Sequence, residues 1–95
     1  MAEVPSLRRS IAILRPLASS NRPITAGALV RALEIPRSSA YELLTVLEEL
    51  GLVVRTESGY VLGAGVHDLG SSYLRTHPLQ RLAQPLVRQL AEAPS

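Results

Sequence analysis

The 95-residue sequence contains no cysteine, no lysine, no tryptophan and no phenylalanine. Without cysteine it can form neither a disulfide framework nor a cysteine-ligated zinc site. It has no run of about 18 apolar residues that could cross a membrane, and its N-terminal MAEVPSLRRS lacks the apolar segment of a signal peptide. We therefore expect a soluble, cytoplasmic protein that forms one small domain with a single modest core.

Aromatic residues are scarce, whereas aliphatic residues are common. The only aromatic residues are three tyrosines, although apolar residues make up 46% of the chain. The core must therefore be built from leucine, valine, isoleucine and alanine. Such a core suits helices that pack through aliphatic ridges.

All ten basic residues are arginines, and they are unevenly distributed. Residues 1–41 hold six arginines and two glutamates, a balance of +4, whereas residues 42–95 hold four arginines, five glutamates and one aspartate, a balance of −2. Concentrated positive charge is what a phosphate-binding face requires. Arginine-biased codon usage would also explain the missing lysine, but the asymmetry favours nucleic-acid binding.

The first predicted helix covers residues 7–18. Ser6 is its expected N-cap, and Pro16 is a point at which it could bend or end. The helical spacing predicts an inward stripe, which consists of Leu7, Ile11, Leu14 and Ala18, widened by Ile13 and Leu17.

Two further helices are predicted on either side of a tight turn at residues 34–36. Thr25 is expected to cap a helix of about nine residues, whose inward residues are Leu29, Ala32 and Leu33, with Ile35 buried in the turn. The next helix begins between Pro36 and Ser39 and runs to Leu50. Ser39 and Glu42 have the spacing of a capping box, and Gly51 ends the helix.

A hairpin and two more helices follow. Residues 52–55 and 60–62 are β-branched runs separated by a polar turn with Gly59 available for positive φ. Helices are then predicted over residues 66–75 and 79–93, the second strongly amphipathic but interrupted by Pro85. This order predicts a mainly α (α+β) fold, a winged helix-turn-helix over residues 6–63 with C-terminal linker helices over residues 64–95.

The helix over residues 37–50 would enter the DNA major groove in this fold. We expect one face to be core, formed by Ala40, Leu43, Leu44, Leu47 and Leu50. The opposite face carries Ser38, Glu42, Thr45 and Glu49, flanked by Tyr41. The acidic residues near its far end, Glu48 and Glu49, would repel phosphates and are read as solvated charges.

The residue types at the start of this helix suit contacts with bases and phosphates. Arg37 could contact a guanine edge or a phosphate, Glu42 could accept from cytosine N4, and the Thr45 methyl group could meet a thymine methyl group. Phosphate contacts are expected from Thr25 at a helix N-terminus and from flanking arginines. The predicted DNA contacts are Arg22, Thr25, Arg37, Ser38, Ser39, Tyr41, Glu42, Thr45 and Arg55.

These residues resemble the N-terminal part of the IclR-type (isocitrate lyase regulator) transcription factors. The resemblance lies in the order and spacing of several short stretches, which are Ser6-Leu7-Arg8-Arg9, Ile13-Leu14, Ile24-Thr25, Ile35-Pro36-Arg37-Ser38-Ser39, Leu43-Leu44, Leu47, Leu50-Gly51-Leu52-Val53, Tyr60-Val61-Leu62-Gly63, Leu69-Gly70 and residues 83–91. It implies a bacterial regulator that binds double-stranded, partly palindromic operators as a dimer or tetramer of DNA-binding domains.

The resemblance also implies a larger C-terminal domain that senses a small molecule. No such domain follows here, so we expect a fragment, a truncated form or a short paralogue, with no small-molecule effector bound within these residues. Family members often carry a basic residue where this chain has Glu42, which affects the expected operator sequence. The apolar stripe of the last segment predicts a homodimer formed through residues 66–93 and the first helix.

Two other function classes compete with DNA binding. A winged helix can serve as a protein–protein interaction module, which Glu42, Glu48 and Glu49 would favour and the arginines oppose. An enzyme is disfavoured because the only imidazoles are His67 and His77, and no cofactor is expected. His67 and Asp68 are neighbours expected to point in different directions on a helix, so no metal site is predicted.

Overall fold

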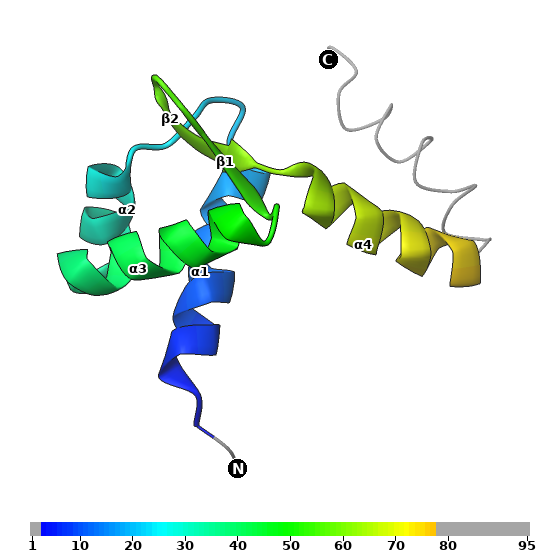
Figure 1. Ribbon diagram of the computed structural model, residues 1–95, viewed down its shortest axis with the longest axis horizontal. Helices are drawn as coiled ribbons and strands as arrows, with labels where there is room; N and C mark the ends of the chain where they lie inside the picture. The colour runs from blue at the N-terminus through cyan, green and yellow to red at the C-terminus, as the bar shows by residue number, and fades with distance from the viewer. Residues whose placement is uncertain (1–2, 78–95) are drawn as a thin grey trace, which may run out of the picture.

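The computed structural model describes residues 3–77 and contains four helices and one hairpin in this range (Figure 1). In chain order the elements are α1 (Pro5–Ser19), α2 (Ala26–Leu33), α3 (Arg37–Glu49), β1 (Val53–Thr56), β2 (Gly59–Leu62) and α4 (Ala64–Thr76). This is the mainly α, winged helix-turn-helix architecture predicted from the sequence. The helix predicted over residues 79–93 lies outside the described residues.

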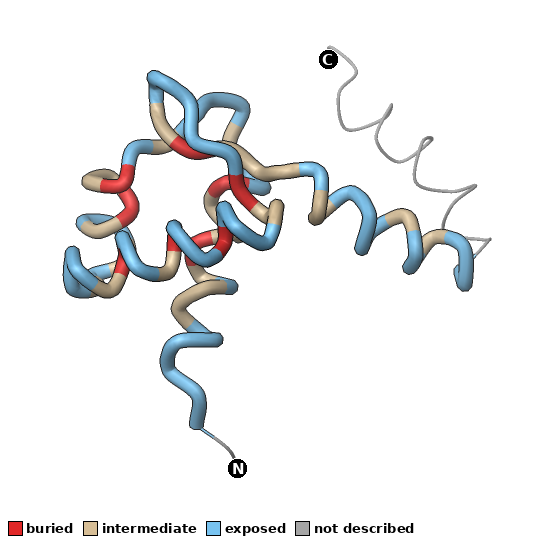
Figure 2. Tube along the Cα trace, viewed as in Figure 1, coloured by how far each residue is buried: buried red, intermediate tan, exposed pale blue. Residues whose placement is uncertain are grey.

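The core lies where α1, α2, α3 and the hairpin meet (Figure 2). Its largest fully buried side chains come from four different elements and are Ile13, Leu29, Leu44 and Val53. Tyr60 of β2 completes it at 7% exposure. A small aliphatic core of this kind makes each of these elements depend on the others for its stability.

Helix α1 differs from its prediction at its start and in the face that it buries. It begins at Pro5, with Val4 at the N-cap, so the prediction of Ser6 as N-cap is wrong. Proline suits the first helical position because its fixed φ and missing N–H cost nothing there. Leu7 and Ile11 are 60% and 43% exposed, because the first half of α1 extends beyond the core that Ile13 and Leu17 reach (Figure 2).

Helix α2 is capped as predicted. Thr25 Oγ1 accepts a hydrogen bond from the Ala28 N–H at 3.1 Å, and Glu34 ends the helix in the left-handed conformation with φ 54°. Leu29 is buried, but Ala32 is exposed, so its prediction as an inward residue is wrong. Ile35 in the turn is half-buried against the core.

Helix α3 begins at Arg37, within the predicted range, but without the predicted capping box. Pro36 occupies the N-cap position in an extended conformation, so Ser39 already lies inside the helix and cannot cap it. At the other end Leu50 is the C-cap residue and is 63% exposed, which contradicts its prediction as core. Gly51 then ends the helix with φ 76°, as predicted.

The hairpin pairs β1 with β2 in antiparallel register, from Val53 opposite Leu62 to Thr56 opposite Gly59. The Thr56 hydroxyl closes the turn, because it donates to the Gly59 carbonyl at 2.8 Å and accepts from the Ser58 N–H at 3.2 Å. Gly59 has the positive φ (137°) expected for it. A further bridge joins β2 to the segment before α2, through Ile24 and Tyr60.

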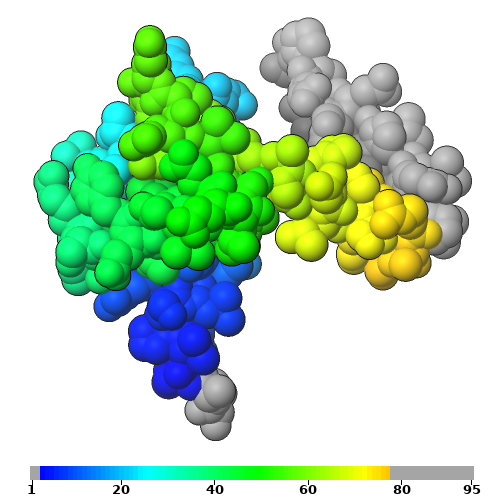
Figure 3. Space-filling view, in the orientation of Figure 1, coloured from blue at the N-terminus to red at the C-terminus, as the bar shows by residue number. Residues whose placement is uncertain are grey.

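Helix α4 leaves the body of the domain in a direction set by backbone contacts (Figure 3). The Gly65 N–H donates to the Gly51 carbonyl at 2.9 Å, and the Gly63 N–H donates to the Leu52 carbonyl at 2.8 Å. A Cβ on Gly65 would lie 2.8 Å from the Gly51 carbonyl oxygen, so this approach requires glycine. The helix starts two residues before its predicted start and buries none of its residues within the described chain.

Candidate nucleic-acid interface

Helix α3 presents one side to the core and the other to solvent. Ala40, Leu44 and Leu47 are buried. Ser38, Glu42 and Thr45 lie on the opposite side and are exposed, as the helical spacing predicts. We call these three residues the outer ridge of α3. The buried side of α3 therefore packs on the core, while the polar side chains of the outer ridge remain accessible to a partner.

Two shallow hollows flank the outer ridge. One lies between α3 and the hairpin and is lined by Tyr41, Thr45, Glu48, Glu49, Arg55 and Tyr60. The other lies along α3 itself and is lined by Ser38, Tyr41, Glu42, Leu43, Thr45 and Val46. Tyr41 and Thr45 line both hollows, so they stand between them. The structure therefore brings Arg55 of β1 to the same surface as the predicted residues of α3.

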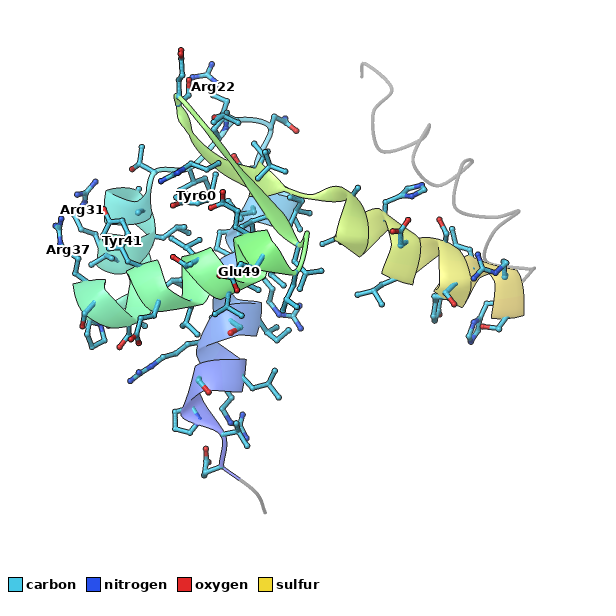
Figure 4. The ribbon with its side chains drawn as sticks, in the orientation of Figure 1. Arg22, Arg31, Arg37, Tyr41, Glu49 and Tyr60 are labelled. Carbon is cyan, nitrogen blue, oxygen red and sulfur yellow. The ribbon has the colours of Figure 1, made fainter. Side chains whose placement is uncertain are left out.

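Three arginines lie around this surface, and Arg37 among them is the first residue of α3 itself (Figure 4). Arg22 lies in the loop that runs beside the hairpin, and Arg31 and Arg37 lie at the end of the molecule where α3 begins. Within residues 3–77, no carboxylate lies within 4.0 Å of these arginines or of Arg55. Their charges are therefore available for phosphates as far as the described chain is concerned.

Arg31 is a further candidate contact, which is not among the contacts predicted from the sequence. Its Nη1 lies 3.5 Å from the position that a Cβ on Gly27 would occupy, so the guanidinium folds back along α2 toward its N-terminal turn. That turn carries unpaired N–H groups and the positive end of the helix dipole. The signal was present in the sequence, because Arg31 follows Gly27 by one helical turn.

The remaining predicted contacts differ in how far they are exposed. Thr25 is exposed and caps α2, and its hydroxyl hydrogen remains available to a phosphate. Ser38 is exposed, whereas Ser39 is half-buried and lies off the outer ridge. The wing tip consists of the exposed Glu57 and Ser58, and a glutamate at this point is unfavourable near DNA.

The described residues do not meet what a metal site or a membrane-spanning helix requires. Within residues 3–77, no three His, Asp or Glu side chains gather as metal ligands would. His67 and Asp68 were expected to point apart, but His67 Nδ1 lies 3.9 Å from Asp68 Oδ1, as an exposed pair on α4. None of the helices in this part of the chain is both long and apolar enough to span a bilayer.

The sequence matches a family model described as the IclR helix-turn-helix domain over residues 6–57. This chain belongs to the IclR family. The matched range contains α2, α3, β1 and all of α1 except Pro5, and therefore includes the outer ridge and the arginines around it. The chain thus carries the DNA-binding helix-turn-helix domain of an IclR-type regulator, as the resemblance predicted.

Individual relatives agree with this family assignment. The chain is 32% identical over 92 residues to the transcriptional repressor IclR of Escherichia coli K12, covering 95% of this chain and 34% of that protein. It is 30% identical over 92 residues to the glycerol operon regulatory protein of Streptomyces coelicolor, covering 95% of this chain and 36% of that protein. The chain therefore spans about a third of the length of these relatives, which are named as regulators rather than enzymes.

Solved structures show the same fold. The repressor BlcR of Agobacterium tumefaciens superposes with a TM-score of 0.69 at 38% identity, over 76% of this chain and 29% of that chain. A transcriptional regulator from Rhodococcus sp. RHA1 superposes with a TM-score of 0.65 at 34% identity, over 78% of this chain and 29% of that chain. The winged helix-turn-helix of the IclR family is thus supported by both sequence and structure.

Proposed function

We propose that this chain reads one half-site of a double-stranded operator with α3 in the major groove, and that it binds an inverted repeat as a homodimer in the cytoplasm. The observation that carries the proposal is the outer ridge of α3. Ser38, Glu42 and Thr45 are exposed on a helix whose other side is fixed by the core. A rigid helix with short polar side chains facing outward can approach base edges closely.

The phosphate contacts would come from the arginines around this ridge. Arg31 and Arg55 lie on α2 and β1, which both pack against α3, and Arg22 lies in the loop beside the hairpin, so the three arginines could contact the backbone on both sides of the groove. Thr25 would add the capped N-terminus of α2. Such phosphate contacts determine the affinity and the orientation of the protein on DNA, whereas the outer ridge determines which base sequence is bound.

We assign residues 6–63 to the DNA-binding unit and residues 64–95 to a linker toward the effector domain that family resemblance implies. No small-molecule effector site is assigned to residues 6–63. Helix α4 suits a linker, because none of its residues is buried within the described chain. Its first turn is nevertheless hydrogen-bonded to the end of α3, through Gly65 and Gly51.

Dimerisation is supported by an apolar groove between α1 and the end of α3. The groove is lined mostly by aliphatic side chains, which are Leu7, Ile11, Leu14, Leu43, Val46, Leu47, Leu50 and Leu52, together with Ser6 and Ser10. Four of these residues are more than 40% exposed, namely Leu7, Ile11, Val46 and Leu50. Contiguous exposed apolar side chains favour contact with another protein surface, and a second copy would match the symmetry of an inverted repeat.

The test is selection of bound sequences from a random duplex DNA pool at two salt concentrations, followed by sequencing. Enrichment of an inverted repeat, with affinity that falls steeply as salt rises, is the expected result. No binding at low salt by the folded protein would contradict the proposal and favour a protein–protein interaction module, which the apolar groove would also serve. A fusion to a dimerising coiled coil would separate this outcome from weak pairing of the domain.

A further inference from the structure

One side chain on the outer ridge of α3 has its hydroxyl group already engaged. Thr45 Oγ1 donates a hydrogen bond to the Tyr41 backbone carbonyl at 2.9 Å. A hydroxyl has a single hydrogen to donate, so Thr45 has none left for guanine or for the O4 of thymine while this bond is present. The methyl group is then the part of the side chain that remains for a partner.

One neighbour of Thr45 is also carbon-rich and exposed. Tyr41 is 45% exposed and lines the same hollow as Thr45. Tyr41 precedes Thr45 by four residues and therefore lies one helical turn away on the same side of α3. The Thr45 methyl group and the Tyr41 ring form an apolar area beside the polar side chains of Ser38 and Glu42, which line the same hollow.

An apolar area on a recognition helix can identify only one feature of unmodified DNA in the major groove. That feature is the C5-methyl group of thymine, because the other base edges are read through hydrogen-bond donors and acceptors. Burying a methyl group against carbon is favourable, whereas burying a base amino or carbonyl group there without a hydrogen bond is costly. The surroundings of Thr45 therefore suit a methyl group better than any other major-groove feature.

We propose that Thr45, together with Tyr41, reads the 5-methyl group of a pyrimidine, which is thymine in unmodified DNA. The proposal rests on the proposed function and narrows it by naming the base feature that is read near the centre of α3. The same group occurs in 5-methylcytosine. Glu42, on the neighbouring part of the outer ridge, can accept from the N4 amino group that cytosine keeps. Methylated cytosine at this position is therefore bound more tightly than cytosine.

The test uses the sequence enriched from the random pool and replaces each thymine in turn by uracil, which removes only the methyl group. At one position in each half-site, uracil is expected to weaken binding by about three- to fivefold, the loss that one buried methyl group brings. Thr45→Ser keeps the hydroxyl and removes the methyl group, so thymine and uracil should then bind equally at that position. Thr45→Val keeps a methyl group in place and should retain the discrimination.

A second pair of duplexes places cytosine or 5-methylcytosine at the identified position. Methylation is expected to restore about threefold or more of the affinity lost on replacing thymine, and only in variants with a methyl group at position 45. The proposal is overturned if replacing thymine by uracil weakens binding at none of the positions. It is also overturned if the loss of affinity persists in Thr45→Ser. Enrichment of a sequence without this discrimination would leave the proposed function standing, whereas no enrichment would overturn both.

Discussion

Ile24, in the segment before α2, and Tyr60 of β2 form a bridge in which each residue donates one backbone hydrogen bond to the other. The Tyr60 N–H donates to the Ile24 carbonyl at 2.8 Å, and the Ile24 N–H donates to the Tyr60 carbonyl at 3.0 Å. Ile24 directly precedes Thr25, which caps α2. The bridge therefore fixes the wing to the start of α2, so the two elements that border α3 are held relative to each other.

This bridge predicts that a side chain at position 59 destabilises the domain. A Cβ there would lie 2.6 Å from the Ile24 carbonyl carbon, and φ is 137°. Gly59→Ala is expected to lower the free energy of unfolding by about 1–3 kcal/mol, from backbone strain and loss of the bridge. Urea unfolding followed by circular dichroism measures the change.

Gly70→Ala is the matched control for that substitution. Gly70 lies inside α4, and a Cβ there would meet nothing within 4 Å. Alanine is favoured over glycine in a helix by about 0.5–1 kcal/mol, so this variant should be as stable as the parent or more stable. Equal destabilisation by the two substitutions would contradict the role given to the Ile24–Tyr60 bridge.

Local signals explain which parts of the fold could be predicted from the sequence. The Thr25 cap and the Gly51 helix end were correct because each depends on one residue type meeting a local backbone need. Ser6 and Ser39 failed as caps because a nearby proline occupied the helix start in each case. At each of these helix starts the sequence offers both a serine and a proline, and only the backbone conformation shows which residue begins the helix.

Burial was harder to predict than helix position. Helical spacing places Leu7 and Ile11 on an apolar stripe of α1, yet only the part of the helix that reaches the core is buried. Spacing gives the direction of a side chain but not whether another element lies in that direction. For the site, Arg55 was predicted as a contact, but only the packing of β1 against α3 shows that it shares a hollow with Tyr41 and Thr45.

The core assignment on α3 can be tested by comparing two leucines. Leu44 is fully buried, whereas Leu50 is 63% exposed. Leu44→Ala should destabilise the domain by about 2–5 kcal/mol, which is a large share of the roughly 5–15 kcal/mol typical of a small domain. Leu50→Ala should change stability by no more than about 0.5 kcal/mol. Thermal unfolding of both variants under one set of conditions provides the comparison.

Arg37 is expected to contact a phosphate rather than a base edge. It lies seven residues before the buried Leu44, so both leave α3 on nearly the same side, away from the outer ridge. Arg37→Ala should weaken binding to all DNA sequences alike and reduce the slope of log affinity against log salt by about one. Fluorescence anisotropy at several salt concentrations measures both quantities.

Arg75→Ala serves as the control for that measurement, because Arg75 lies in the last turn of α4 at the far end from α2 and α3 (Figure 1). It should leave the salt slope unchanged. If Arg37→Ala instead relaxes the preference at a single base pair and leaves the salt slope intact, Arg37 contacts a base edge. The placement of the phosphate backbone around α3 would then have to be revised.

The apolar groove makes a prediction about self-association that is separate from DNA affinity. Leu7 is 60% exposed in the single chain, so Leu7→Glu should fold normally, but it would bury a charge if a second copy covered the groove. The variant is expected to sediment as a monomer at concentrations where the parent chain sediments as a dimer. Val54→Glu places the same charge on an apolar residue of β1 that is 47% exposed and lies outside the groove, and it should not change the sedimentation.

The same variant connects dimerisation to operator binding. Leu7 does not line either hollow beside the outer ridge, so Leu7→Glu should bind an isolated half-site as tightly as the parent chain does. It should lose the additional affinity that an inverted repeat gives to two linked domains. If Leu7→Glu retains that gain, the contact between the two copies lies elsewhere, and the exposed side chains of α4, Leu69 and Tyr73, are the next place to introduce a charge.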